Sequence, residues 1–273
     1  MGYIVGIDIG GSTTKIVGLR GGAVISPISV KAGDPVTSAY GAFGRFLSEN
    51  GLSIADIDRV LATGVGSSFI KEGLFGIPTK RVDEFMAIGR GGCCLAGVER
   101  AIIVSMGTGT ALVAVDGEKC VHLGGSGVGG GSLLGLCDKM IGVRSVEHIV
   151  AMAQRGRLSN VDLTIGDITE GVLSGMGSEI TASNFGKLSD VASSDDLAMG
   201  VANLVFQTIG MFAVFAGKSE KVQDIVLTGK LSTFELARGI YRQLEELHGV
   251  HFIIPEYSDF ATAIGAALAA QEE

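Results

Sequence analysis

Two glycine-rich stretches far apart in the chain decide the fold: GIDIGGSTTK at residues 6–15 and SMGTGTALVAVDG at residues 105–117. Each stretch lies between β-rich segments and offers backbone N–H groups and hydroxyls at a tight turn, which are the groups that hold a nucleotide's phosphates. One such turn is weak evidence, because ordinary hairpin turns have a similar composition. Two of them, each opening a hairpin, predict a duplicated fold that closes on ATP from both sides.

The order of the predicted elements also repeats. Three short β-branched runs separated by turns open the chain, at 3–9, 14–20 and 23–30, and the same opening recurs at 101–106, 111–115 and 119–123. Between them, Asp34-Pro35 predicts the start of a helix, which is followed by a strand at 57–63 and a helix at about 83–98. We therefore expect an α/β protein built from two copies of one unit, residues 1–98 and 99–273.

Composition limits the classes of function. The chain has 273 residues, of which 47% are hydrophobic, enough for two modest cores. A formal net charge of −8 argues against nucleic acid or an anionic membrane as a partner. Met1 leads directly into an apolar strand, so we expect no signal peptide and a cytoplasmic protein. The four cysteines lack metal-ligand spacing and are interpreted as small buried hydrophobes.

One segment, residues 197–217, carries no charge and is about long enough to cross a bilayer. Polar residues and glycines dilute its apolarity, and no belt of Trp or Tyr accompanies it. Its length and polar content favour a buried core helix over a membrane span.

The first glycine-rich stretch supplies candidates for binding phosphate and metal. Asp8 ends an apolar strand, where a carboxylate needs a hydrogen bond or a nearby cation, and a bound Mg²⁺ would supply that cation. Lys15 can neutralise charge on a transferred phosphoryl group. The turn between them offers backbone amides and hydroxyls, at Gly10, Gly11, Ser12 and Thr13. The alternative is a plain hairpin with a capping aspartate and a surface lysine.

The second stretch offers the same groups in one turn, at Gly107, Thr108, Gly109 and Thr110. Residues 124–131 then hold six glycines in eight positions. Their GxGxxG match follows the third strand of a repeat and does not open a βαβ unit, so it is not a dinucleotide fingerprint. Since each glycine loses much conformational entropy on folding, we interpret the run as a phosphate-binding loop that leads into a helix at 132–140. Its candidate residues are Gly125, Gly127, Gly129, Gly130 and Gly131.

Glu84 stands at the predicted start of a helix, beside Asp83. Taken alone, a glutamate there is more often a cap or a residue favoured by the helix dipole. The sequence contains no GxxxxGK[ST], HEXXH or GxSxG motif, which argues against a P-loop nucleotide site and against those two hydrolase types.

Together these motifs resemble the ASKHA superfamily of acetate and sugar kinases, heat-shock ATPases and actin. Within it the chain resembles the type II pantothenate kinases, through VDEFMA at 82–87, GGSGVGGGSLLGLC at 124–137, TASNFGK at 181–187 and FATAIGAAL at 260–268. The resemblance implies two duplicated RNase H-like (actin-like ATPase) domains with a nucleotide cleft between them. It implies ATP and Mg²⁺ as cofactors, a homodimer, and phosphorylation of the pantothenate hydroxyl, the first step of coenzyme A biosynthesis.

The resemblance also implies roles for single residues in catalysis. Glu84 matches the glutamate that deprotonates the pantothenate hydroxyl. Asp8 matches the magnesium-side carboxylate, and Lys15 matches the phosphate-binding lysine. Phosphoryl transfer requires mainly positioning and charge neutralisation, so these residue types suit the reaction.

Other matches concern binding. Thr108 falls where the family has a Ser or Thr near the pantothenate, Gly229 lies at the adenosine-binding turn, and Phe185 and Gly186 belong to the TASNFGK motif at the nucleotide. One departure stands out, because His122 replaces an arginine that grips the pantothenate carboxylate. A histidine makes one bond and is only partly charged at neutral pH. Either His122 or a neighbouring cation binds the carboxylate, or the acceptor is a different small alcohol.

Two alternatives of other classes stay open. The segment ATGVG at 62–66 resembles ATPase activators of radical acyl-CoA dehydratases, although adjacent Cys93 and Cys94 lack the usual spacing for their iron–sulfur cluster. A regulatory nucleotide-binding module without turnover is the other alternative, and the presence of both Glu84 and Lys15 argues against it.

Overall fold

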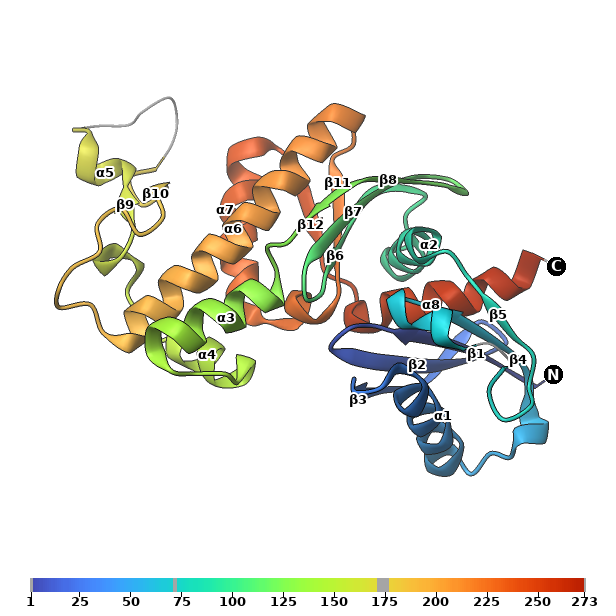
Figure 1. Cartoon of the computed structure of the whole chain (residues 1–273). Helices are drawn as coiled ribbons and strands as arrows, with labels where there is room; N and C mark the ends of the chain where they lie inside the picture. The colour runs from blue at the N-terminus through green and yellow to red at the C-terminus, as the bar shows by residue number, and fades with distance from the viewer. Residues whose placement is uncertain (1, 71–72, 171–176, 273) are drawn as a thin grey trace.

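The computed structural model describes residues 2–70, 73–170 and 177–272. Two five-stranded sheets lie next to each other with helices packed against them, and a two-stranded sheet stands apart at one end (Figure 1). Both chain termini lie beside the first sheet (Figure 1).

The first sheet has the strand order β3-β2-β1-β4-β5. Its strands are β1 (Tyr3–Ile9), β2 (Thr13–Arg20), β3 (Ala23–Lys31), β4 (Ile57–Thr63) and β5 (Thr79–Arg81). The predicted helix start is confirmed: Asp34 caps α1 (Pro35–Asn50) by accepting a hydrogen bond of 2.8 Å from the Thr37 N–H. Helix α1 buries Phe43 and Phe46 against one face of this sheet.

The second sheet repeats this order as β8-β7-β6-β11-β12. Its strands are β6 (Arg100–Met106), β7 (Thr110–Asp116), β8 (Lys119–Ser126), β11 (Asp224–Thr228) and β12 (His251–Ile253). In both sheets the first three strands form antiparallel pairs and the last two join in parallel. The duplication expected from the sequence is therefore confirmed.

A second pair of similar segments follows the fourth strand of each sheet. They read ATGVGSSF at 62–69 and LTGKLSTF at 227–234, and each turns into a 3₁₀-helix, η2 (Val65–Phe69) and η4 (Lys230–Thr233). Gly64 and Gly229 both have φ +85°, a conformation that favours glycine. A Cβ on Gly64 would lie 2.7 Å from the Ile9 carbonyl oxygen, and one on Gly229 would lie 2.5 Å from that of Met106. Each turn therefore needs glycine for the backbone to pack against the first strand of its own sheet.

Two helices each pack on the sheet of the other half of the chain. Helix α2 (Glu84–Ala96) packs Ile88 and Cys93 against the second sheet, whereas α8 (Ala261–Leu268) packs Ala263 and Ile264 against the first. The helices cross in backbone contact, since a Cβ on Gly91 would overlap the Ala261 carbonyl oxygen and one on Gly265 would overlap that of Ala87. This crossing joins the two halves, and the division after residue 98 stays a prediction.

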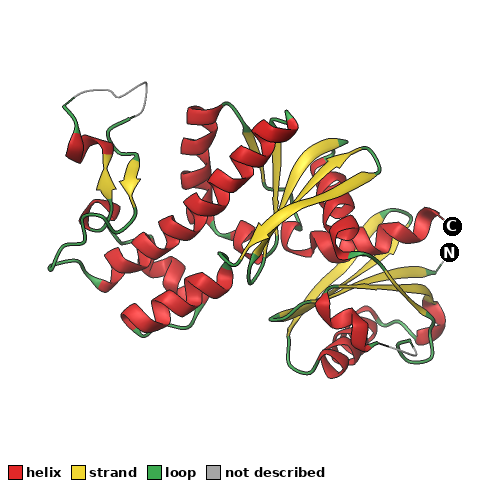
Figure 2. Ribbon diagram, turned by 45° about the horizontal axis from the view of Figure 1, so that its top comes forward, coloured by secondary structure: helices red, strands yellow, loops and turns green. Residues whose placement is uncertain are grey.

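The second half carries additional helices and the small sheet (Figure 2). The helices are α3 (Gly130–Ile141), α4 (Val146–Ala153), α5 (Ile165–Ile168), α6 (Ser194–Glu220) and α7 (Glu235–His248), and the small sheet pairs β9 (Leu163–Thr164) with β10 (Thr181–Ser183). Short 3₁₀ segments complete the described chain, at Ile54–Asp56, Leu158–Asn160, Ser258–Phe260 and Ala269–Glu272.

Helix α6 is the segment whose length and composition alone would allow a membrane span. In the structure 61% of its most apolar window is buried, and Val205, Phe206 and Ile209 lie in the core of the second half. The sequence-based expectation of a core helix is confirmed.

Candidate active site

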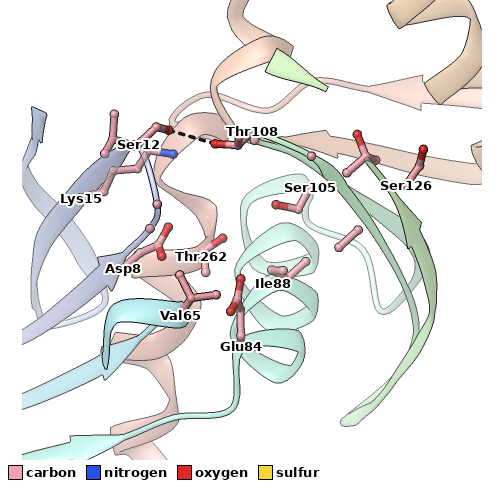
Figure 3. A pocket seen from close by; sticks show the side chains of 18 residues that line it. Asp8, Ser12, Lys15, Val65, Glu84, Ile88, Ser105, Thr108, Ser126 and Thr262 are labelled. Carbon is pink, nitrogen blue, oxygen red and sulfur yellow. Dashed lines mark hydrogen bonds between the residues drawn. The ribbon is translucent and has the colours of Figure 1, made fainter. Parts of the chain in front are cut away.

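A cleft of about 520 Å³ lies between the two glycine-rich turns (Figure 3). The sequence-predicted residues that line it are Asp8, Gly10, Gly11, Ser12, Thr13, Lys15, Glu84, Gly107, Thr108, Gly109, Thr110 and Gly229. Lining residues that the sequence analysis missed are Val65, Ile88, Ser105, Ala111, Ser126 and Thr262. Ser105 and Ala111 flank the second turn, so their position next to it was the available signal.

The two turns meet across the cleft. The Ser12 and Thr108 hydroxyl oxygens lie 3.1 Å apart and share a hydrogen bond (Figure 3). Each turn is closed by its own backbone, because the Gly10 N–H donates to the Thr13 carbonyl over 3.0 Å and the Gly107 N–H donates to the Gly109 carbonyl over 2.9 Å. The hydroxyls of both repeats therefore converge on one place.

Lys15 and Asp8 are register partners on β2 and β1, so their side chains lie on the same face of the sheet. Lys15 is only 8% exposed, and its ammonium lowers the pKa of Asp8. Burial has the larger and opposite effect, the Glu84 carboxylate adds to it, and the pKa of Asp8 rises to about 6. The site thus holds a carboxylate whose charge is only partly compensated.

Glu84 is the first residue of α2, and its side chain projects into the cleft (Figure 3). The side chain that caps the helix is that of Asp83, which accepts a hydrogen bond of 2.9 Å from the Met86 N–H. Burial first, and the Asp83 carboxylate second, raise the pKa of Glu84. A carboxylate with a raised pKa in a cleft has the properties of a general base.

The glycine run at 124–131 lies behind the second turn. The Gly130 N–H donates to the Gly107 carbonyl over 2.9 Å, and the Gly131 N–H donates to the Thr108 carbonyl over 2.8 Å. A Cβ on Gly129 would lie 2.6 Å from the Thr108 carbonyl oxygen. Close packing of the start of α3 on the turn therefore explains Gly129, Gly130 and Gly131. Direct phosphate contact stays a prediction for all five, Gly125, Gly127, Gly129, Gly130 and Gly131.

Three other predicted residues lie outside the cleft lining. The Phe185 N–H donates to the buried Asp162 carboxylate over 2.8 Å. Phe185 and Gly186 follow shortly after β10, whose small sheet stands apart at one end of the molecule (Figure 1). His122 lies exposed on β8, where its ring stacks on Phe85 with a centroid distance of 3.8 Å and an interplanar angle of 10°. Phe85 follows Glu84 directly in the chain, so His122 contacts the residue next to the candidate base.

The donor groups of the cleft fit a magnesium ion bound mostly by a nucleotide. No cluster of three or more His, Cys, Asp or Glu side chains suited to a metal occurs in the ranges that the structure describes. Mg²⁺ in kinase sites is bound through one or two carboxylates together with phosphate oxygens and water. Asp8, with its partly compensated carboxylate, is the residue present for that role.

Comparisons with known proteins agree with this geometry. The family model described as Fumble matches residues 100–235. A type II pantothenate kinase from Bacillus cereus (strain G9842) is 27% identical over 247 residues, 82% of each chain. Another from Staphylococcus aureus (strain USA300) is 29% identical over 79% of this chain and 84% of its own. The chain is a homologue of the type II pantothenate kinases. The recognition made from its motifs is confirmed.

Solved structures show the same fold. An activator of 2-hydroxyisocaproyl-CoA dehydratase from Clostridium difficile with bound ADPNP superposes with a TM-score of 0.70 at 20% identity, over 98% of this chain and 94% of its own. A ROK family glucokinase from Streptomyces griseus in complex with glucose and AMPPNP has a TM-score of 0.65 at 13% identity, with both chains fully covered. The expected ASKHA fold of this type II pantothenate kinase homologue is therefore confirmed.

Proposed function

We propose that this protein transfers the γ-phosphoryl group of ATP to the hydroxyl of pantothenate. The observation that carries the proposal is that Glu84, Asp8 and Lys15 line one cleft between the two glycine-rich turns. The names of its homologues supply the acceptor. A cytoplasmic homodimer with no nucleic acid or membrane partner completes the proposal.

In this mechanism the two turns hold the phosphates. Backbone amides and the Ser12 and Thr108 hydroxyls face the cleft from both sides, and the Lys15 ammonium neutralises charge on the transferred group. Glu84 accepts the proton of the acceptor hydroxyl, and its raised pKa suits a base that works near neutral pH. Bound Mg²⁺, held beside Asp8, would draw charge from the phosphate oxygens.

The carboxylate of pantothenate needs a cation, and the cleft provides few. Lys15 is the one Lys or Arg among the described lining residues, and it lies beside Asp8. His122 stacks on Phe85, the residue after Glu84, and is the proposed partner of the acceptor's carboxylate. A small alcohol without a carboxylate is the alternative acceptor.

The test is an ADP-release assay with pantothenate, pantetheine and several sugars as acceptors. We expect ADP release to depend on pantothenate and on Mg²⁺. Release supported only by another alcohol would keep the nucleotide site and overturn the acceptor. Steady ATP hydrolysis without any acceptor would favour the ATPase-activator class, whose fold this chain shares.

A further inference from the structure

Two threonines in the first sheet bury their hydroxyls without a partner. Thr14 and Thr63 are both 0% exposed, and neither hydroxyl forms a hydrogen bond within the part of the chain that the structure describes. A buried hydroxyl without a partner is destabilising, so each one in a native structure requires an explanation, and a catalytic role or a bound ion nearby is one of them. The surroundings of the two threonines therefore decide whether either hydroxyl has a role at the cleft.

They lie on opposite faces of the sheet. Thr14 pairs in register with Ile9, whose side chain packs against α1. Thr63 pairs in register with Asp8, which in turn pairs with Lys15. Since register partners on neighbouring strands share a face, Lys15, Asp8 and Thr63 form one row across β2, β1 and β4 on the cleft side.

The Asp8 carboxylate lies close to the end of β4. A Cβ built on Gly64, the residue after Thr63, would lie 2.6 Å from Asp8 Oδ1. Burial, Lys15 and Glu84 set the pKa of this carboxylate. No hydrogen bond to it contributes within the described ranges. The Asp8 carboxylate therefore lacks a hydrogen-bond donor, and the hydroxyl of Thr63, its register partner on the adjacent strand, lacks an acceptor.

The second repeat shows what happens when no carboxylate is present. Thr228 holds the position equivalent to Thr63, and its register partner on β6 is Ser105. There the threonine hydroxyl donates to the Val104 carbonyl over 3.3 Å. The hydroxyl bonds to the backbone in the repeat that lacks the aspartate and stays unpaired in the repeat that has it.

We propose that Thr63 is a positioning residue whose hydroxyl donates to the Asp8 carboxylate when the magnesium–nucleotide complex is bound. The contact would form by rotation of the Thr63 side chain about its Cα–Cβ bond to another staggered position. The bond would fix the orientation of the carboxylate that is proposed to bind the metal. This inference rests on the proposed nucleotide site and adds a residue to it.

The experiment measures ADP binding by calorimetry, with Mg²⁺ and with EDTA, for the wild type and three variants. Thr63→Val removes the hydroxyl at nearly constant volume, Thr63→Ser retains it, and Thr14→Val removes the matched hydroxyl on the other face. We expect Thr63→Val to lose about tenfold of the Mg²⁺-dependent gain in ADP affinity, as for one hydrogen bond to a charged group. Thr63→Ser and Thr14→Val should keep that gain.

Thermal melting without nucleotide checks folding, and both valine variants should melt at or above the wild-type temperature because each removes an unpaired buried hydroxyl. If Thr63→Val does not fold, Thr63→Ala against Thr63→Ser provides the same contrast. A Thr63→Val protein with the wild-type Mg²⁺ effect, or equal losses in Thr63→Val and Thr14→Val, would overturn the inference. Wild-type protein that binds no ADP would instead overturn the proposed function.

Discussion

Replacing Asp8 by asparagine is expected to stabilise the free protein. Burial raises the folded-state pKa of Asp8 from 3.8 to about 6, so the folded protein binds this proton more tightly than the unfolded chain does. The free energy of unfolding therefore falls as pH rises from about 4 to about 6, and the loss is complete above that range. A difference of about 2 pKa units corresponds to about 3 kcal/mol.

Asparagine resembles the protonated carboxyl and avoids this loss. At pH 8 the free energy of unfolding of Asp8→Asn should exceed that of the wild type by up to about 3 kcal/mol, and the difference should vanish near pH 4. The assay is urea unfolding of both proteins at pH 4, 5, 6, 7 and 8 without nucleotide. The same variant should lose the Mg²⁺-dependent part of its ADP affinity.

Asp196→Asn is the matched control of opposite sign. Backbone N–H groups of Arg157 and Ser193 donate to Asp196 and lower its pKa, so its neutral replacement should destabilise the protein at pH 8. An Asp8→Asn protein that is less stable than the wild type at pH 8, or a difference that does not change with pH, would refute the reasoning. Either result would mean that the ionised Asp8 carboxylate does not destabilise the folded protein.

Further predictions concern the base, the acceptor and the glycine run. Glu84→Gln should lower kcat by about two to four orders of magnitude in steady-state kinetics while leaving ATP affinity nearly unchanged. It should also remove the rise of kcat/KM with pH that the raised pKa of Glu84 gives the wild type. A loss of kcat below about tenfold would return Glu84 to a structural role. His122→Arg should lower the KM for pantothenate, because a guanidinium is permanently charged and donates two parallel hydrogen bonds to a carboxylate; a His122→Ala variant with an unchanged KM would assign the carboxylate to another cation. Gly129→Ala should destabilise the protein by about 1–3 kcal/mol in urea unfolding, because its Cβ would lie 2.6 Å from the Thr108 carbonyl oxygen. Gly135→Ala, in open space within α3, the helix that Gly129 precedes, should stabilise the protein by about 1 kcal/mol, and equal effects would contradict the packing explanation.

Local signals in the sequence predicted much of the fold. The strand at 57–63 has the predicted bounds, and α1 begins at Pro35 as the capping residues indicated. The duplication was visible because both first turns repeat glycine and threonine. Short β5, β9 and β10 escaped prediction, since two or three residues are too few to show a period.

Long-range packing escaped prediction for a different reason. Nothing in the periodicity of α2 or α8 tells which sheet each helix covers, and the contact of Gly91 with Ala261 joins residues 170 positions apart (261 − 91). The packing partners of Gly129 and Thr63 could not be predicted from the sequence either. Glycine composition alone does not distinguish a phosphate contact from a backbone contact, and a threonine in a strand reveals its partner only through the register.

The most direct test of the central claim is the identity of the product. Wild-type protein incubated with ATP, Mg²⁺ and pantothenate should yield one ADP for each pantothenate that gains a phosphate, as read by mass spectrometry of the acceptor, and Glu84→Gln should yield almost none in the same time. ADP formed while pantothenate keeps its original mass would contradict the proposed phosphoryl transfer.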